Sequence, residues 1–445
     1  MVHAFFERFC WLVQQRWICQ HRQRYTEGGY KLKQTTSTCQ SHDTIPAQQH
    51  ICIVSETYAP EINGVALTLA RLTEGLRTAG CRVSIVRPRQ RTVDPPGDAF
   101  DSLTLVRGVP FPGRRGIQFG LPAADLLLRQ WTRRRPDVLY VATEGPLAWS
   151  AVRTAQRLAI PVLSGFHTNF HTYSKYYRLG WLQRLILCYL RSFHNRTAGT
   201  VVPSADMRNQ LQHAGFTNIS ILDHGVDSHV FSPTRRSASL RAQWGLADDD
   251  VAVLYVGRVV PEKNLHVAVD AYHAMQRSGK PLKWIIVGDG PLRPRLQRQH
   301  ADVIFCGILF GERLAEHYAS ADVFLFPSET ETFGNVTLEA MASGLAVVAY
   351  DYAAAHLHIR HEQNGLLAPL GCTQAFVDAA SRLVHEPHTR NILRRHARRS
   401  IVGFDWQRVV KRFELLLMNA GARAIRPERA LATPDLEPNA REGKI

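Results

Sequence analysis

Short runs of consecutive apolar residues recur along the chain, and most of them are followed by a turn and a segment of helical periodicity. The first such unit has the apolar run Ile51–Val54, a turn at Asn63-Gly64, and a helix predicted over Val65–Ala79 that ends at Gly80. Four to eight apolar residues between turn signals are typical of a strand buried on both faces of a parallel sheet. The pattern therefore predicts alternating strands and helices.

The same alternation continues in two series. In the first, further strands are predicted at Arg82–Val86, Val138–Val141, Pro161–Leu163, Gly199–Val202 and Ile219–Leu222, with a helix over Pro146–Leu158. In the second, strands are predicted at Val251–Val256, Lys283–Val287, Asp302–Phe305, Val323–Phe326 and Ala346–Ala349, with a helix over Asn264–Ser278. The polar residues 232–250 between the series are interpreted as a linker. This order predicts an α/β protein with two Rossmann-like, doubly wound domains that face a cleft.

Domain limits follow from these series. We expect residues 1–48 to be a poorly ordered extension, or to precede the true start of translation, because they carry no strand or helix signal of useful length. The first domain is predicted over 49–235 and the second over 236–405. A helix over 406–420 is expected to pack back toward the first domain, and 421–445 to form a flexible tail.

The composition narrows the classes of protein. Of 445 residues, 54 are Lys or Arg and 38 are Asp or Glu, which gives a formal charge of +16. Such an excess favours an anionic partner: nucleic acid, anionic lipid or a phosphorylated small molecule. No apolar run is long enough to span a membrane, the first twenty residues lack a signal-peptide core, and the eight cysteines are scattered without a CxxC pair. We expect a cytoplasmic protein, soluble or peripheral on the inner face of the plasma membrane.

Two glutamates surround a candidate anion site. Glu331 follows the predicted strand Val323–Phe326, and Glu339 lies about one turn into the next helix. The backbone N–H groups of residues 334–336 (Gly334, Asn335 and Val336) would form that helix's N-terminus, where anions bind readily. The alternative is an exposed acidic loop and a solvated helix face.

A second candidate anion site lies in the loop after the strand Val251–Val256. Arg258 and Lys263 flank a turn there, which suits a pyrophosphate because Arg offers a planar fork and Lys a point charge. Gly64 occupies the corresponding turn of the first series, where a missing side chain allows backbone approach to a phosphate. A solvated turn is the alternative for the first loop, and a generic Asn-Gly turn for the second.

These motifs together resemble a known family. Those that carry the resemblance are Glu331–x7–Glu339, 257–264 (GRVVPEKN), 287–291 (VGDGP), 225–227 (GVD), 364–367 (NGLL) and 55–65 (SETYAPEINGV). Over roughly residues 51–420 the chain resembles the retaining glycosyltransferases of family 4, which have the GT-B fold. The opening motif and 166–170 (FHTNF) are most similar to bacterial GDP-mannose-dependent α-mannosyltransferases, and almost as similar to sulfoquinovosyltransferases. Ala353–Ala355 stands where many relatives carry Gly-Gly-Pro, so the chain departs from the family pattern in that donor-side loop.

The resemblance implies roles for the matching residues. Arg258 and Lys263 would bind the diphosphate of a nucleotide-sugar donor in the second domain, and Gly64 would approach it from the first, the acceptor domain. Glu331 would hold hydroxyls of the donor sugar, and Glu339 the ribose.

His167 matches the family's active-site histidine near the anomeric carbon, so His167 and Glu331 are the predicted catalytic residues. We predict a hexosyltransferase that moves mannose from GDP-mannose to a lipid-linked or polysaccharide acceptor with retention. The alternatives are a UDP-sulfoquinovose-dependent sulfoquinovosyltransferase or another glycolipid glucosyltransferase, and a non-catalytic sugar-nucleotide or nucleic-acid binder. We expect no metal, no cofactor beyond the donor co-substrate, and no nucleic-acid partner.

Two segments imitate metal sites. Asp248–Asp250 contains the letters of a DxD motif but precedes a strand, so it is interpreted as a solvated turn. His356, His358 and His361 lack a supporting carboxylate or cysteine framework and are assigned to a surface loop. His171 is four residues after His167, but only His167 is given a function.

The first domain carries a strongly basic region. Residues 145–205 contain seven Lys or Arg and no acid, and 107–135 add seven Arg against one acid. A helix is predicted over 176–196 with Arg184 and Arg191 on one side. The apolar residues expected on the opposite side are Trp181, Leu185, Tyr189 and Phe193. This pattern favours contact with anionic lipid, and the alternative is a helix that packs on the core with its arginines in water.

Overall fold

The computed structural model describes residues 48–59, 61, 63–90, 102–110, 118–167, 180–331 and 333–425. The predicted N-terminal extension, apart from residue 48, lies outside these ranges, as does the predicted tail beyond residue 425. Residues 168–170 of the FHTNF motif, His171 and the side chain of Trp181 also lie outside them.

The first half of the described chain forms a seven-stranded parallel sheet with the order β3-β2-β1-β6-β7-β8-β9. Its strands are β1 (His50–Val54), β2 (Arg82–Pro88), β3 (Ser102–Val106), β6 (Val138–Val141), β7 (Val162–Gly165), β8 (Gly199–Val202) and β9 (Ile219–Ile221). Its helices are α2 (Gly64–Thr78), α3 (Ala124–Arg133), α4 (Pro146–Arg157), α6 (Gly180–His194) and α7 (Ala205–His213), and β4 (Gly108–Pro110) and β5 (Gln118–Gly120) form a separate antiparallel pair.

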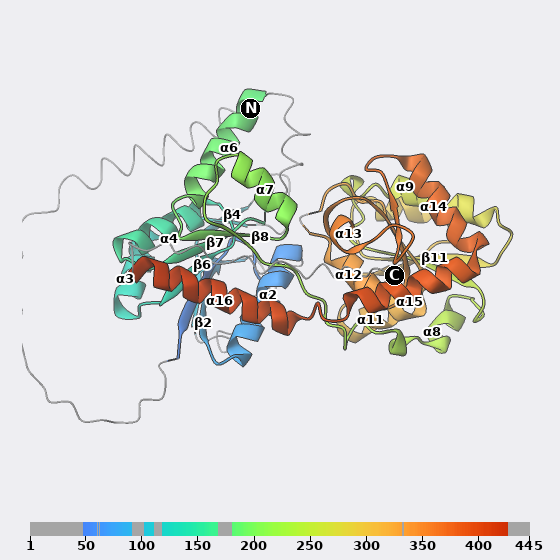
Figure 1. Cartoon of the computed structure of the whole chain (residues 1–445), viewed down its shortest axis with the longest axis horizontal. Helices are drawn as coiled ribbons and strands as arrows, with labels where there is room; N and C mark the ends of the chain where they lie inside the picture. Colours follow the sequence, from blue (N-terminus) through green and yellow to red (C-terminus); the bar gives the residue numbers. More distant parts are fainter. Residues whose placement is uncertain are drawn as a thin grey trace, which may run out of the picture. The chain divides into compact units, whose positions relative to one another are not determined.

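Strand β1 shows why this sheet is covered on both faces. Ile51 and Ile53 belong to one apolar core and Cys52 and Val54 to another, because alternate side chains of a strand point to opposite faces. Residues of α2 and of the C-terminal helix α16 (Trp406–Ile425) complete the first core, and residues of α3 and α4 complete the second. Figure 1 shows α16 running beside α2 against this sheet.

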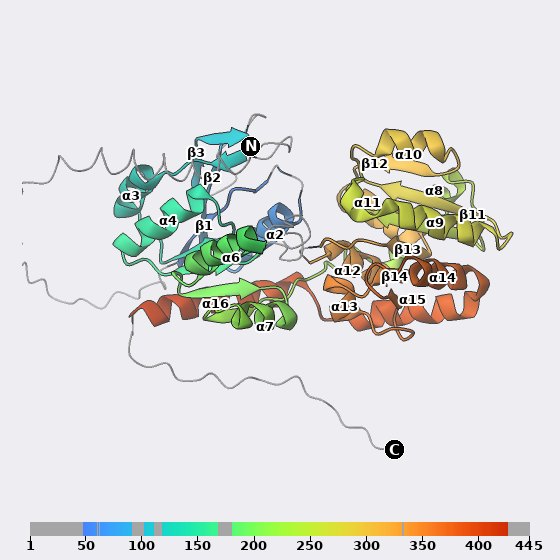
Figure 2. The ribbon, with the colours of Figure 1, turned by 90° about the horizontal axis from the view of Figure 1, so that it is seen from above.

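The second half forms a six-stranded parallel sheet with the order β12-β11-β10-β13-β14-β15. Its strands are β10 (Val251–Val256), β11 (Leu282–Val287), β12 (Ile304–Gly307), β13 (Val323–Phe326), β14 (Ala346–Tyr350) and β15 (Leu366–Ala368). The remaining helical segments are η2 (Pro233–Arg235), α8 (Ala238–Gln243), η3 (Pro261–Lys263), α9 (Leu265–Gln276), α10 (Arg293–Gln299), α11 (Gly311–Ser320), α12 (Asn335–Ala342), α13 (Ala353–His358), α14 (Thr373–His385) and α15 (Pro387–Ile401). Figure 2 shows β12 and α10 at one edge of this sheet.

Both sheets reverse their strand order at one point. The first strand of each series lies next to the strand that starts the return: β1 beside β6, and β10 beside β13. Ligands of doubly wound sheets bind outside the carboxyl ends of the strands at such a reversal. The loops after these four strands are therefore the places to look for a site.

The interpretation of residues 232–250 as a linker is wrong. The segment folds into η2 and α8, and Leu240 and Trp244 are buried in the core of the second sheet. Arg241 is fully buried and forms an ion pair with Asp322. Several arginines and serines of this segment form contacts inside the domain. Its polar composition therefore does not mean that the segment is exposed to solvent.

Two further expectations need correction. The strand predicted at Asp302–Phe305 is shifted to Ile304–Gly307. The segment with His356 and His358 is the short helix α13, not a loop, and its first residue, Ala353, has a φ of 52°. That left-handed conformation favours glycine, so Ala353, the first of the three alanines at 353–355, occupies a strained position.

Candidate active site

Lys263 and Glu331 meet at the strand-order reversal of the second sheet. Lys263 ends the short helix η3 in the loop after β10, and Glu331 lies in the loop after β13. The Lys263 ammonium forms an ion pair with the Glu331 carboxylate, and its Nζ also lies 3.3 Å from Ser328 Oγ and from the Thr330 carbonyl oxygen. The Lys263 residue is only 8% exposed. A buried cation held by one carboxylate can exchange that partner for an anionic ligand.

Arg258 lies in the same loop but is exposed. Its guanidinium contacts Glu262 Oε1 at 3.3 Å, and the Arg258 backbone carbonyl accepts a hydrogen bond from Tyr255 Oη at 3.0 Å. The backbone of this residue is thus fixed while its charged head remains accessible. The structure brings Lys263 and Glu331 into direct contact, whereas the guanidinium of Arg258 pairs with Glu262.

The loops after β10 and β11 approach each other so closely that side chains are excluded. A Cβ on Gly288 would lie 1.9 Å from the Gly257 carbonyl oxygen, and one on Gly290 would lie 2.3 Å from the Val259 carbonyl oxygen. Gly257 and Gly288 also have φ values of 155° and 138°. These glycines of the GRVV and VGDGP motifs shape the loop that holds Arg258, and need no ligand to explain them.

Helix α12 begins beside Glu331. Gly334 caps it with a φ of 97°, in the left-handed region, and a Cβ there would lie 3.4 Å from Glu331 Cγ. The first turn of an α-helix leaves N–H groups without intrahelical partners, here on Asn335 and Val336. The Asn335 side-chain oxygen lies 2.8 Å from His224 Nδ1.

Glu339 lies further along α12 and is held by a tyrosine. Tyr318 Oη donates a hydrogen bond of 2.9 Å to Glu339 Oε2. Burial raises the pKa of Glu339 to about 7, while the Tyr318 hydrogen bond and the charge of Arg71 act in the opposite direction. The carboxyl group therefore changes its charge near neutral pH.

Gly64 is the first residue of helix α2, which Asn63 caps through a hydrogen bond of 2.9 Å from Ala66 N to its side-chain oxygen. A Cβ built on Gly64 meets no atom within 4 Å. The described fold therefore does not require glycine at this position, in contrast to Gly288, and the role assigned to Gly64 remains a prediction.

The Gly64→Ala variant separates these explanations. Since the added methyl group contacts no other part of the described chain and alanine favours helices, the melting temperature should not fall. If a phosphate must approach the backbone, transfer should fall on the order of ten- to a hundredfold, the scale of a small misplacement of reacting groups. Steady-state kinetics and differential scanning fluorimetry measure both. Unchanged kinetics would show that Gly64 serves only the turn.

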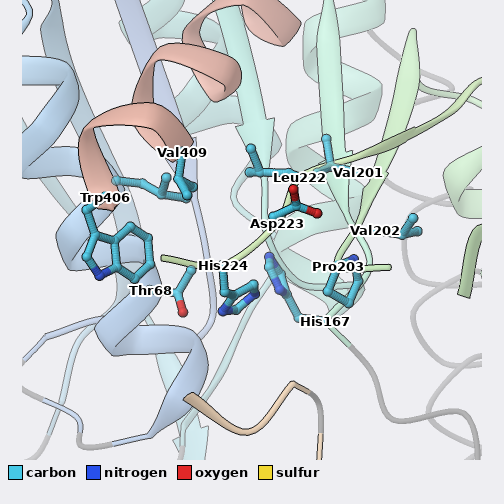
Figure 3. Close-up of a pocket in the computed structure, with 11 residues that line it drawn as sticks. Thr68, His167, Val201, Val202, Pro203, Leu222, Asp223, His224, Trp406 and Val409 are labelled. Atoms are coloured by element: carbon cyan, nitrogen blue, oxygen red, sulfur yellow. The ribbon is translucent and has the colours of Figure 1, made fainter. Parts of the chain in front are cut away.

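His167 lies at the carboxyl end of β7 in a pocket of the first sheet. The pocket is lined by Thr68, Leu72, His167, Val201, Val202, Pro203, Leu222, Asp223, His224, Trp406 and Val409. Figure 3 shows the rings of His167 and His224 close together, with Asp223 beside them. Burial above all, together with the neighbouring His224 and His194, lowers the pKa of His167 to about 3. His167 is therefore neutral at pH 7.

Sequence reasoning missed several residues of this pocket. Asp223 and His224 lie just beyond the carboxyl end of β9, after Leu222, so the rule that sites form at carboxyl ends of strands could have found them. Burial raises the pKa of Asp223, against the charges of Arg408 and Arg412 on α16. Trp406 comes from α16, and no local sequence signal links that helix to the pocket.

The reversal point of the first sheet holds another missed carboxyl group. Glu56 follows β1, is 7% exposed, and its Oε1 accepts a hydrogen bond of 3.2 Å from Leu147 N at the start of α4. Burial raises the pKa of Glu56 to about 8. The N-cap of α4, Gly145, has no side chain, and a Cβ there would lie 1.9 Å from Glu56 Oε1. Glu56 thus takes the capping position that Gly145 leaves open.

Comparison with known proteins adds independent evidence. Residues 62–230 match the family model described as Glycosyltransferase Family 4, and residues 250–386 match the model described as Glycosyl transferases group 1. The chain is 32% identical to a GDP-mannose-dependent alpha-mannosyltransferase of Mycobacterium tuberculosis over 80% of this chain and 93% of that protein. The chain belongs to the family 4 glycosyltransferases.

Other relatives differ in the donors or products that their names give. The chain is 30% identical to a sulfoquinovosyl transferase of Arabidopsis thaliana over 68% of this chain and 60% of that protein. It is 26% identical to an alpha-monoglucosyldiacylglycerol synthase of Streptococcus pneumoniae over 67% of this chain and 70% of that protein. The alternative of a non-catalytic binding protein is therefore set aside: this glycosyltransferase is an enzyme.

The fold agrees with this assignment. Sucrose-phosphate synthase from Thermosynechococcus elongatus matches with a TM-score of 0.68 at 20% identity, over 84% of this chain and all of that one. The prediction of a GT-B fold with two Rossmann-like domains is confirmed.

Asp248–Asp250 lies apart from Lys263 and Glu331. Asp248–Asp250 precedes β10, at the opposite end of the strand from the loop of Arg258, and Asp250 accepts a hydrogen bond of 2.7 Å from Ala247 N. The helix with His356 and His358 instead begins beside Glu331, whose carbonyl oxygen accepts a hydrogen bond of 3.3 Å from Tyr352 Oη at the N-cap of α13. His358 packs its ring against Phe404. Within the described ranges, no three His, Cys, Asp or Glu side chains gather in a way that could hold a metal ion.

Helix α6 exposes a face that differs from the expected one. Leu190, Phe193 and His194 are buried, whereas Leu185 and Tyr189 are 56% and 43% exposed. Arg184 and Arg191 are also exposed. The prediction that Leu185, Tyr189 and Phe193 share one face is wrong. Each step of four residues turns about 40° around a helix, so Leu185 and Tyr189 face solvent and Phe193 faces the core.

The buried side of α6 is fixed by polar contacts. His194 Nδ1 lies 2.9 Å from Ser164 Oγ in β7, and His194 Nε2 lies 3.3 Å from Glu144 Oε1 in the loop after β6. Tyr189 Oη donates a hydrogen bond to the Glu144 carbonyl oxygen. These contacts fix the buried side of α6, while Arg184, Leu185 and Arg191 lie on its exposed side. In the part of the chain that the structure describes, no helix is long and apolar enough to cross a bilayer.

Proposed function

We propose that this glycosyltransferase transfers mannose from GDP-mannose, with retention of configuration, to a lipid-linked or polysaccharide acceptor. The observation that carries the proposal is the 32% identity to a GDP-mannose-dependent alpha-mannosyltransferase over 93% of that relative. The sulfoquinovosyl transferase matches over only 60% of its own length, which makes a UDP-sulfoquinovose donor the second candidate.

In this proposal the donor diphosphate binds at the strand-order reversal of the second sheet. Lys263 exchanges its ion pair with Glu331 for the diphosphate, and this frees the Glu331 carboxylate to accept hydrogen bonds from hydroxyls of the donor sugar. Arg258 is accessible and can turn toward the same diphosphate. The N–H groups at Gly334, Asn335 and Val336 add the positive end of α12, and Glu339 is positioned to accept from the ribose hydroxyls.

The chemistry requires stabilisation of the departing nucleoside diphosphate. Negative charge develops on its terminal phosphate as the glycosidic bond breaks, and fixed donors aimed at that charge lower the barrier. Lys263, Arg258 and the start of α12 supply such donors from the chain itself. His167 would lie near the anomeric carbon. The acceptor hydroxyl attacks on the face that the leaving group vacates, and its proton passes to the departing phosphate oxygen. We therefore expect metal-independent transfer.

A donor screen tests this function. Purified protein is offered GDP-mannose, UDP-sulfoquinovose and UDP-glucose, and release of the nucleotide is measured with and without EDTA. The expected result is release of GDP from GDP-mannose, unchanged by EDTA. Turnover of UDP-sulfoquinovose instead would establish the second candidate, and loss of activity in EDTA that manganese or magnesium restores would contradict the metal-independent mechanism.

We also propose that α6 contacts an anionic membrane surface on which a lipid acceptor lies. A relative is an alpha-monoglucosyldiacylglycerol synthase, whose product is a lipid. The exposed side of α6 combines Leu185 and Tyr189 with Arg184 and Arg191, and apolar groups beside cations are typical of helices that lie in the interface of a bilayer.

Reversing the charges of α6 should weaken this contact. Each arginine near an anionic surface contributes about 1 kcal/mol, so Arg184→Glu/Arg191→Glu should reduce binding to phosphatidylglycerol liposomes at least about thirtyfold. Arg295→Glu/Arg298→Glu on α10 makes the same change in net charge elsewhere and should reduce it much less. Sedimentation at low and high salt measures both variants, with nucleotide release as the check on folding. Equal sedimentation of the α6 variant and the wild type would refute the contact.

A further inference from the structure

His167 is held by a buried tyrosine. Tyr140 lies in β6, the neighbour of β7 in the sheet, and its Oη lies 2.9 Å from His167 Nε2. The Tyr140 side chain is fully buried, and its ring packs edge-on against Phe413 of α16, with 4.7 Å between ring centroids. The hydroxyl is therefore fixed in position by the ring that carries it.

Gly165 leaves the space in which this hydrogen bond forms. A Cβ on Gly165, the last residue of β7, would lie 2.1 Å from Tyr140 Oη and 2.6 Å from His167 Nε2. The φ of Gly165 is not in the left-handed region, so its backbone conformation is open to any residue. The space between Tyr140 and His167 is what requires glycine here.

The hydrogen-bonding capacity of the tyrosine fixes the direction of the bond. A neutral imidazole has one N–H donor and one acceptor nitrogen, and a tyrosine hydroxyl can donate or accept. If Nε2 carried the proton, the buried Tyr140 O–H would lack an acceptor, because the described residues offer it none besides His167. A buried donor without a partner is unfavourable, because it gives up its hydrogen bonds with water and gains none in return. The hydroxyl therefore donates to Nε2, and the proton of the neutral ring lies on Nδ1.

We propose that Tyr140, admitted by Gly165, is a positioning residue that fixes His167 as the Nδ1–H tautomer. The ring then presents an N–H donor, not a lone pair, to an oxygen atom of the donor sugar or of the acceptor. The inference rests on the proposed function for the presence of sugar at His167, but the tautomer itself is a property of the free protein. Burial of His167 and the neighbouring His224 and His194 keep the ring uncharged, so that one tautomer can persist.

Nitrogen-15 NMR of histidine-labelled protein tests the tautomer without any substrate. Spectra that correlate the carbon-bound hydrogens of the imidazole with its two nitrogens distinguish protonated from unprotonated nitrogens by their chemical shifts. The signal that is missing in the His167→Gln variant belongs to His167. We expect the Nδ1–H form in the wild type and a shift toward Nε2–H or a mixture in Tyr140→Phe, which keeps the ring packed on Phe413. An Nε2–H ring in the wild type, or an unchanged spectrum in the variant, would overturn the inference.

Kinetics test whether the tautomer matters for transfer. Tyr140→Phe should lower kcat/KM for the sugar donor by about tenfold, the scale of one lost hydrogen bond, while affinity for free GDP stays unchanged. Tyr272→Phe is the matched control, because it removes a buried tyrosine hydrogen bond of the same 2.9 Å length, to Asp302, in the second domain. Equal kinetics of both variants and the wild type would overturn the positioning role.

A double-variant cycle isolates the role of Gly165. Gly165→Ala should displace the same hydroxyl and produce the same tautomer change as Tyr140→Phe. The double variant should lose clearly less transition-state stabilisation, measured from kcat/KM, than the sum of the losses in the two single variants, because both changes remove the same hydrogen bond. Additive losses would contradict the shared interaction. Full activity of His167→Gln, with the tautomer change still present in Tyr140→Phe, would refute the function proposed for His167 and leave the hydrogen bond standing.

Discussion

Lys263→Ala should lower the rate of sugar transfer by two to three orders of magnitude. Loss of one preorganised donor to a developing anion typically costs about 2.7–4 kcal/mol, or 10²–10³ in kcat. Lys263 is suited to this role because it is largely buried and because its contacts with Ser328 and Thr330 fix its position. The centroid of the Phe326 ring also lies 5.7 Å from Lys263 Nζ. Arg258→Ala should lower the rate in the same direction, and because Arg258 is exposed it should disturb the folded structure less than Lys263→Ala.

Lys280→Ala is the matched control for Lys263→Ala. Lys280 lies in the same domain, is exposed, and its Nζ donates to the Val384 carbonyl oxygen at 3.0 Å. Initial rates of GDP release and the Kd for GDP, measured by calorimetry, separate the contribution to binding from that to the chemical step. Near wild-type rates in both Lys263→Ala and Arg258→Ala would refute the diphosphate site.

Most of the sheet could be predicted from the sequence because its strands are buried on both faces. Val138–Val141, Gly199–Val202, Val251–Val256 and Val323–Phe326 have the expected bounds. Such strands are continuous apolar runs that contrast with the turns around them. β12 was misplaced because its residues Ile304, Phe305 and Cys306 are only partly buried at the sheet edge, where the apolar run is shorter and less regular.

Residues of the candidate site could be selected from the sequence where polar side chains follow a predicted strand. Lys263 and Glu331 each follow an apolar run, and the structure brings them into contact. Tyr140 could not be found in this way, since it lies inside the run Val138–Val141 and looks like core. Its hydroxyl reaches His167 only because β7 is the neighbouring strand, which ends at Gly165 two residues before His167. Local periodicity predicts individual strands, but it does not predict which of two strands more than twenty residues apart will pair.

Asp322 also has contacts that local periodicity does not predict, and its replacement should cause a large loss in the free energy of unfolding. Its Oδ1 lies 3.0 Å from Arg394 and 3.1 Å from Arg236, and its Oδ2 lies 3.0 Å from Arg241. The same Oδ2 accepts a hydrogen bond of 2.9 Å from Ala252 N in β10. Asp322 is 4% exposed and Arg241 is fully buried. One carboxylate thus balances three guanidinium groups at the amino end of β13.

Asp322→Ala should therefore lower the free energy of unfolding by about 3–5 kcal/mol, the cost of leaving a buried charge without its partner. For a domain of this size that corresponds to roughly 6–20 °C in melting temperature, measured by scanning fluorimetry. The exposed Asp378, whose Oδ1 accepts one hydrogen bond of 2.8 Å from Gln374, provides the control Asp378→Ala, which should change the melting temperature little. Because Asp322 lies at the opposite end of β13 from Glu331, the transfer rate of Asp322→Ala well below its melting temperature should match the wild type. A melting temperature within about 2 °C of the wild type, less than 1 kcal/mol, would mean that the three arginines find other partners.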